Sequence, residues 1–198
     1  MFPQLNKMQD CSACLDELLV QYCSPTLAGI KASNMFRVAV QEESCIRHYL
    51  EYGNRKLNGK GIHAKCLRHC NGSALILVYR KKDLQGILDK PEVRLFLEAE
   101  GYCQHNVESC LTRLSYRMKG NAFPHEIGIF LGYPLPDVQG FIANGGRNYR
   151  FSGYWKVYSD EENTRRRFLC IDRVCRKFKE CFLAGNTIDQ LTVCKERA

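Results

Sequence analysis

The sequence lacks any apolar run long enough to span a membrane. Its longest run covers residues 74–79, whereas a helix that crosses a bilayer needs about 20 apolar residues. The first ten residues, "MFPQLNKMQD", also lack a basic stretch followed by an apolar block, which is the pattern of a secretion signal. We therefore expect a cytoplasmic protein that has no membrane partner.

Proline is scarce, with six residues, and no stretch is rich in proline, glycine or serine in the way that linkers are. Internal repeats are missing as well. The content of 45% hydrophobic and 25% charged residues is that of a folded globular protein. We therefore expect residues 1–198 to form a single domain, with a loose N-terminus over residues 1–8.

Cysteine, in contrast, is abundant, with twelve residues. A chain of this length buries a substantial core without covalent cross-links. Because no secretion signal is expected, we interpret the cysteines as reduced thiols that pack as small apolar side chains. Many oxidisable side chains are best tolerated in a cell that rarely meets oxygen. This interpretation indicates the reducing cytoplasm of an anaerobe.

Positive charge exceeds negative charge, with 29 Lys and Arg against 21 Asp and Glu. The net charge of +8 makes anionic partners plausible, because a basic surface attracts anions whatever the fold. The basic segments at residues 165–167 and 176–179 are interpreted as the solvated face of a helix. Nucleic acid stays open as a partner, and charge alone does not establish it.

The spacing of apolar residues predicts an α+β fold, with a small, mainly antiparallel sheet of about four strands covered by helices. The pair Asn71-Gly72 lies between two apolar segments and is the strongest short signal for a β-hairpin. Strands are also expected at residues 35–40 and 149–160. Helices are expected at residues 9–22, 42–57, 83–89, 91–100 and 106–119, in two short segments within 125–144, and from Asp160 to Gly185.

Three blocks of the sequence resemble one bacterial family. They are "CSPTLAGIK" at residues 23–31, "FPHEIGIFLGYPLPDVQGFI" at residues 123–142 and "GYWKVY" at residues 153–158. In these blocks the chain is similar to the domain-of-unknown-function family thirty-seven ninety-three, which is found mainly in anaerobic Clostridia. The resemblance extends over nearly the whole chain.

This resemblance implies a cytosolic protein of an anaerobe. Genes of the family often lie near flavodoxin and ferrous-iron uptake genes, which implies a flavodoxin-linked context in iron or redox physiology. The family supplies no known catalytic residues. Many relatives carry cysteines just before the "WKVY" part of the last block, where this chain has Tyr149, Phe151 and Tyr154. This departure weakens any thiol or metal site proposed there.

The segment "HEIGIFLGYP", residues 125–134, predicts a pair of short helices like those of a helix-turn-helix. Gly128 would be the close contact between the helices and Gly132 the turn. A version that reads DNA would place the second helix in the major groove, yet Asp137 at its tip would repel phosphate. We interpret the pair mainly as architecture, and we keep His125 and Glu126 as candidates for catalysis.

The segment "CSPT" places Cys23 after the helix at residues 9–22, because Pro25 disfavours helical geometry at the residue before it. We expect Cys23 in a loop ahead of a short helix that begins at Thr26. Backbone N–H groups there would lower the pKa of the thiol, and His125 would be its base. The alternative is a buried cysteine that packs as an apolar residue.

Histidine and cysteine, the ligands that zinc and iron prefer, cluster in the expected hairpin. They are His63, Cys66, His69 and Cys70. Residues an odd number of positions apart in a strand point to opposite faces, so the four do not share one face. At best His69 or Cys70 would contribute to a site assembled elsewhere. The pair Cys11 and Cys14 is a weak dithiol or metal half-site.

Aromatic and basic residues gather in the strand expected at residues 149–160. Trp155 and Tyr154 beside Lys156 would stack on a base or a flavin-like ring, or they simply fill the faces of a sheet. The glycine-containing loop at residues 144–147 would present backbone N–H groups to an anion. It lacks the fixed spacing of a phosphate-binding loop.

Three functions are open, and the sequence identifies no cofactor. The first is an accessory protein in iron or redox physiology that binds a metal ion or a small anionic ligand near residues 23–31, His125 and the aromatic strand. Its ligand-binding candidates are Thr26, Lys31, Tyr133, Trp155 and Lys156. The second is an enzyme in which Cys23, His125 and Glu126 act. The third is a nucleic-acid-binding module that uses the helix pair at residues 124–144.

Overall fold

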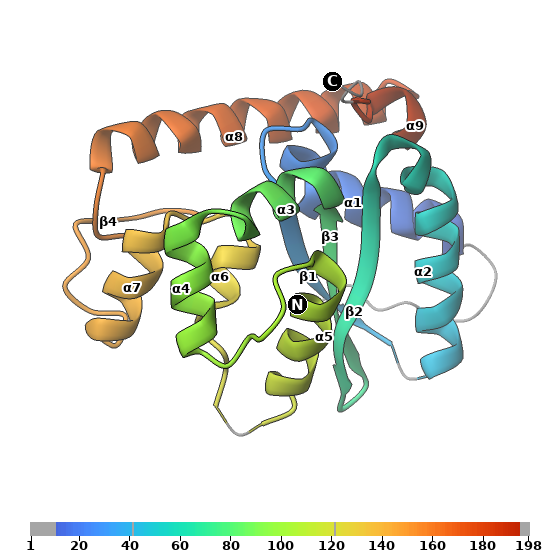
Figure 1. The fold of residues 1–198 in the computed structure, drawn as a ribbon. Coiled ribbons are helices and arrows are strands. Elements are labelled where there is room, and N and C mark those ends of the chain that lie inside the picture. The colour runs from blue at the N-terminus through green and yellow to red at the C-terminus, as the bar shows by residue number, and fades with distance from the viewer. Residues whose placement is uncertain (1–10, 41, 121, 195–198) are drawn as a thin grey trace.

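The computed structural model describes residues 11–40, 42–120 and 122–194. The N-terminus expected to be loose, residues 1–8, lies outside them. Within the described residues the fold is α+β, as predicted, with a small antiparallel sheet in the middle and helices around it (Figure 1). The elements are α1 (Cys11–Leu27), β1 (Ser33–Ala39), α2 (Glu43–Leu57), the short 3-10 helix η1 (Asn58–Lys60), β2 (Ile62–Cys70), β3 (Ser73–Arg80), α3 (Lys81–Leu88), α4 (Pro91–Ala99), α5 (Val107–Arg117), α6 (Ile127–Phe130), α7 (Leu135–Ala143), β4 (Phe151–Ser152), β5 (Lys156–Val157), α8 (Glu161–Leu183) and α9 (Ile188–Leu191).

The main sheet has three antiparallel strands in the order β1-β3-β2. The expected hairpin is confirmed, because Cys70 pairs with Ser73, and Asn71 and Gly72 between them have φ of 50° and 67°. An Asn-Gly pair accommodates this left-handed geometry at both turn positions. β3 is the central strand, and helices pack on both faces of the sheet. Side chains of β3 are therefore buried on both sides, which explains the long apolar run at residues 74–79.

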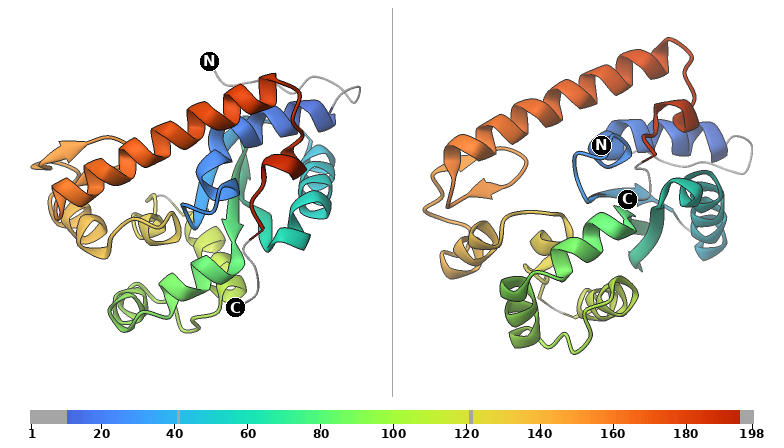
Figure 2. Two further views of the ribbon diagram at one scale, coloured as in Figure 1. Left: turned by 90° about the horizontal axis from the view of Figure 1, so that it is seen from above. Right: turned by 45° about the horizontal axis from the view of Figure 1, so that its top comes forward.

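Helices cover the two faces of this sheet, and the sheet separates two cores, one on each face (Figure 2). The first core lies between the sheet, α1 and α2, and α8 runs across the outside of α1. The second core lies between the sheet and α3, α4, α5 and α6. Ile76 and Val78 of β3 belong to the first core. Leu77 and Tyr79 belong to the second, as the alternation of a strand requires.

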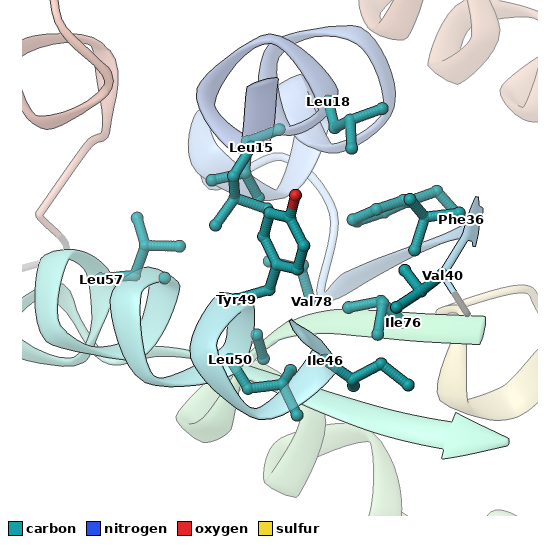
Figure 3. Close-up of a pocket in the computed structure, with 14 residues that line it drawn as sticks. Leu15, Leu18, Phe36, Val40, Ile46, Tyr49, Leu50, Leu57, Ile76 and Val78 are labelled. Carbon is teal, nitrogen blue, oxygen red and sulfur yellow. The ribbon is translucent and has the colours of Figure 1, made fainter. Parts of the chain in front are cut away.

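A small apolar space is left inside the first core, between α1, α2 and the sheet (Figure 3). It measures about 20 Å³, which is room for about one water molecule. Its lining is aliphatic and aromatic, and Tyr49 of α2 reaches toward Leu15 of α1 within it. A space this small is a packing gap in a core and does not accommodate a ligand.

The first helix runs past the position where the sequence predicted its end. α1 continues to Leu27 with Pro25 inside it, so the expected loop at Cys23 and the short helix beginning at Thr26 are wrong. Pro25 lies in the last turn, where its missing N–H costs one helical bond, and its own carbonyl still accepts from the amide of Ile30 at 3.0 Å. Burial of Cys23 and Leu27 in the first core stabilises this turn.

The continuous strand expected at residues 149–160 is instead a small hairpin, in which β4 and β5 pair antiparallel. The chain reverses near Gly153, where an added Cβ would lie 2.3 Å from the ring of Phe168, so this close approach requires glycine. The hairpin and α8 enclose a third, smaller core that contains Trp155. The main sheet thus has three strands, and two further strands form this hairpin.

The long helix α8 begins and ends where predicted. The side chain of Asp160 accepts a hydrogen bond from the amide of Asn163 at 3.1 Å, and Gly185 just beyond the helix has φ of 94°. The helix extends along one side of the molecule, from the hairpin to α9 (Figure 1). Across the described part of the chain, no helix has the length and apolar character needed to cross a membrane.

Candidate ligand-binding site

The segment at residues 125–134 forms the turn between α6 and α7, and two glycines make this turn possible. An added Cβ on Gly128 would lie 2.7 Å from Cγ2 of Val138, so the two helices touch at this position. Gly132 has φ of 73°, the left-handed geometry that favours glycine. The predicted close contact at Gly128 and the predicted turn at Gly132 are both confirmed.

Asp137, in the first turn of α7, points into the protein and is 2% exposed. Its carboxylate accepts four hydrogen bonds. The donors are the indole N–H of Trp155 at 2.8 Å, the amides of Tyr158 and Ser159 at 2.8 and 2.9 Å, and the hydroxyl of Ser159 at 2.8 Å. These bonds join α7 to the hairpin and to the segment before α8. The expectation that Asp137 lies at the exposed tip of a DNA-reading helix is therefore wrong.

Tyr133 and Trp155 lie side by side in a cleft between the α6–α7 turn and the hairpin. Their rings stack with centroids 4.7 Å apart and planes inclined by 24°. The cleft has a volume of about 360 Å³, within the range of small-molecule sites. Its lining also includes Lys156 and His125, whose ring lies 5.0 Å from that of Phe141. The structure thus brings together four of the residues predicted from the sequence.

Lys156 carries positive charge at this cleft. Its ammonium group donates to the carbonyl of Gly146 at 2.7 Å and lies 5.7 Å from the ring of Phe141 and 5.0 Å from that of Tyr149. The loop at residues 144–147 was a candidate anion site, but all four of its amides already donate to backbone carbonyls of residues 140–144. This loop therefore offers no free amide, and Lys156 provides positive charge at the cleft.

Lys31 lies against the same aromatic pair, in the segment that joins α1 to β1. It is 8% exposed, and its Nζ lies 5.2 Å from the centre of the Tyr133 ring. Burial lowers the pKa of Lys31 to about 8, although the thiol of Cys23 acts in the opposite direction. Arg167 of α8 is a second cation beside the pair, with its guanidinium group 5.2 Å from the ring of Trp155. Arg167 is exposed, as the interpretation of its segment as a solvated helix face predicted, but its contact with Trp155 was not predicted.

His125 and Glu126 are neighbours in sequence but belong to different parts of the protein. His125 is exposed in the cleft. Glu126 is 2% exposed, pairs with Nε of Arg117 at 2.5 Å and accepts a hydrogen bond from the hydroxyl of Tyr102 at 3.0 Å. Burial and the charge of Glu126 raise the pKa of Tyr102. Glu126 therefore joins α6 to α5 and does not form an acid-base pair with His125.

Cys23 lies fully buried in the first core. Burial raises the pKa of its thiol, and the charge of Lys31 acts in the opposite direction. Thr26 is buried as well, and its hydroxyl donates to Oδ1 of Asn34 at 2.7 Å. The geometry separates Cys23 and Thr26 from the cleft that contains His125. It does not favour a thiol nucleophile with His125 as its base.

Among the described residues, no three His, Cys, Asp or Glu side chains lie together in a way that could hold a metal ion. The predicted hairpin cluster is spread along β2, where His69 interacts with a backbone carbonyl at 3.1 Å and Cys66 with the carbonyl of Arg68 at 3.4 Å. The side chains of Cys11 and Cys14 lie outside the described part of the chain. The cysteines that are described are free thiols.

A family model described as "Protein of unknown function (DUF3793)" matches residues 19–192, and the chain belongs to this family. The matched residues include the α6–α7 turn and the hairpin, so the cleft is part of the domain that defines the family. No curated protein and no solved structure matches the chain. The family description states no activity, so function is argued from the cleft itself.

Proposed function

We propose that this chain is an accessory protein that binds a small, planar, anionic molecule in the cleft between the α6–α7 turn and the β4–β5 hairpin. The observation that carries the proposal is the stacked pair of Tyr133 and Trp155 in the wall of that cleft. A flat ring gains favourable contact with aromatic side chains of this kind. Lys156 supplies positive charge and His125 an exposed polar edge on the same cleft.

The small anion is the better supported of the two ligand classes expected from the sequence. The cleft contributes aromatic rings and a cation, whereas the described residues contain no cluster of metal ligands. A cleft of about 360 Å³ has the size of a site for one small molecule. The enzyme alternative has less support, because the thiol of Cys23 is buried and its pKa is raised.

The proposed setting is the reducing cytoplasm of an anaerobe. Cys103, Cys170 and Cys194 are exposed free thiols, and exposed thiols persist where disulfides do not form. A role in iron or redox physiology, with a flavodoxin-linked context, belongs to the same proposal and rests on the family resemblance.

Calorimetric titration with flavin mononucleotide and with riboflavin tests the proposal, because the two share a planar ring and differ by a phosphate. We expect flavin mononucleotide to bind about tenfold more tightly, the effect of about 1.4 kcal/mol from one charge-assisted contact. Lys156→Gln should remove this difference, and Tyr133→Leu should weaken both ligands. Lys177→Gln on the exposed face of α8 is the matched control. Absence of binding by either compound at about 100 times the protein concentration would contradict the proposal.

A further inference from the structure

The cluster around Lys31 contains two cations and no carboxylate that neutralises the lysine. Among the described residues, the ammonium group of Lys31 has no hydrogen-bond or ion-pair partner, and it lies over the ring of Tyr133. Three neighbouring groups shift the pKa of Lys31 electrostatically. They are the thiols of Cys23 and Cys175 and the guanidinium group of Arg167. Arg167 makes the charge balance worse, since it is positive as well.

Asp137 is a carboxylate that raises the pKa of Arg167, but it is not among the groups that shift the pKa of Lys31. Its hydrogen-bonding capacity is already in use. Both of its oxygens accept hydrogen bonds, from Trp155 on one side and from Tyr158 and Ser159 on the other. The guanidinium group of Arg167 has a single hydrogen bond, to a backbone carbonyl at 3.3 Å.

A buried charge without a partner is costly, and proteins normally pair it or neutralise it. Here the side chain is nine-tenths buried, and the groups around it are aromatic rings, thiols that burial keeps protonated, and a second cation. Arg167 is exposed, and partial desolvation of its guanidinium group lowers its pKa. Both cations would be stabilised by one small anion placed between them.

We infer that Lys31 and Arg167 form a binding site for an oxyanion, such as a sulfate, phosphate or carboxylate group, beside the stacked rings of Tyr133 and Trp155. Lys31 comes from the α1–β1 segment and Arg167 from α8, whereas the two rings come from the α6–α7 turn and the hairpin. The site therefore forms only when four separate segments are assembled. An anion bound there bridges the two sides of the fold that meet at the rings.

This inference goes beyond the proposed function, because Lys31 and Arg167 do not line the cleft and the anionic group of the cleft ligand is placed at Lys156. It has its own test, since inorganic sulfate has no ring and keeps its charge between about pH 6 and pH 9. Sulfate binding with no flavin binding would remove the planar ligand and keep the anion site. Flavin binding with no sulfate binding would contradict the anion site and leave the planar ligand of the cleft standing.

The experiment is a sulfate titration of the full chain at constant ionic strength, followed through the fluorescence of Trp155, the single tryptophan of the sequence. We expect a saturable response in the unmodified protein that weakens at least tenfold in Lys31→Met and in Arg167→Gln. Lys177→Met and Arg166→Gln are matched controls on the exposed part of α8 and should bind as the unmodified protein does. Comparison with these controls separates specific binding from the general stabilisation that sulfate gives to folded proteins.

The pH dependence of sulfate binding can be measured on the unmodified protein, so it tests the inference even if a variant fails to fold. Because only the protonated lysine attracts an anion, sulfate affinity should fall by about tenfold between pH 7 and pH 9. The other titratable groups around Lys31 are the thiols of Cys23 and Cys175 and the hydroxyl of Tyr133, and burial raises the pKa of each. A flat pH profile, an unchanged affinity in Lys31→Met, or no saturable response at all would overturn the inference.

Discussion

The indole N–H of Trp155 donates to Oδ2 of Asp137 at 2.8 Å, and this bond joins the hairpin to α7 across 18 residues of sequence. Both residues are buried. The second oxygen of the same carboxylate accepts from the backbone of residues 158 and 159. One aspartate therefore fixes the wall of the cleft that carries Trp155 and the segment from which α8 begins.

Replacement of Asp137 by alanine should destabilise the protein by about 3 kcal/mol, because it leaves several buried donors without an acceptor. Urea unfolding followed by the emission of Trp155 measures the loss, and the emission of the folded variant should shift to the red. Asp172→Ala is a suitable control, since Asp172 accepts a bond from Tyr154 at an exposed position. A loss for Asp137→Ala no larger than that of the control would contradict this account of the hairpin.

Gly128→Ala should destabilise the protein by about 1–3 kcal/mol, the usual effect of overpacking. The added Cβ would lie 2.7 Å from Val138 and 3.2 Å from Tyr133, so the ring of Tyr133 would also have to move. Gly86→Ala in α3 is the matched control. Its added Cβ meets nothing within 4 Å, and alanine favours helix by about 1 kcal/mol. Thermal unfolding of the two variants should therefore shift in opposite directions.

The stability of the protein should depend on pH through Lys31. Burial lowers its pKa to about 8 in the folded chain, whereas an unfolded lysine titrates near 10.4. Between these values the unfolded chain binds more protons, so stability rises with pH by up to about 1.4 kcal/mol per pH unit. Below this range the folded chain bears the full cost of the buried charge.

Lys31→Met lacks this titration and should be more stable than the unmodified protein at about pH 7 in a buffer of weakly binding anions, by about 2 kcal/mol. The difference should shrink as the pH rises through about 8 to 10, as chemical denaturation at several pH values would show. A lysine whose replacement lowers stability at neutral pH would have a structural partner, contrary to the geometry described above.

Cys23 should resist alkylation at neutral pH. It is fully buried and the pKa of its thiol is raised, whereas Cys103 and Cys170 are exposed. Brief treatment with iodoacetamide and peptide mapping by mass spectrometry should find label on Cys103 and Cys170 and not on Cys23. Rapid labelling of Cys23 that is lost in His125→Ala would instead support the thiol enzyme.

Local patterns predicted the parts of this fold that depend on neighbouring residues. The left-handed positions Asn71 and Gly72 specify the β2–β3 hairpin, and Asp160 and Gly185 bound α8. Gly128 and Gly132 likewise identified the α6–α7 turn. Each of these residues acts within a few positions of its own place in the chain.

The features that the sequence did not reveal depend on distant residues. Pro25 predicted the end of α1, but burial of the turn around it outweighs the loss of one helical bond. The reversal at Gly153 is explained by Phe168 of another element. The contact of Arg167 with the ring of Trp155 joins residues of two different elements. Tyr133 and Trp155 were each predicted as ligand-binding residues. Their stacking was not predicted, because it depends on how the hairpin folds against the α6–α7 turn.

The most direct test of the cleft uses the indole N–H of Trp155, which gives one cross-peak in a nitrogen-proton correlation spectrum because the chain has one tryptophan. Titration with flavin mononucleotide should move this peak saturably, and Tyr133→Leu should abolish the movement at the same concentrations. A peak that stays in place while ligand accumulates to a large excess would contradict the claim that the stacked pair of Tyr133 and Trp155 binds a planar anion.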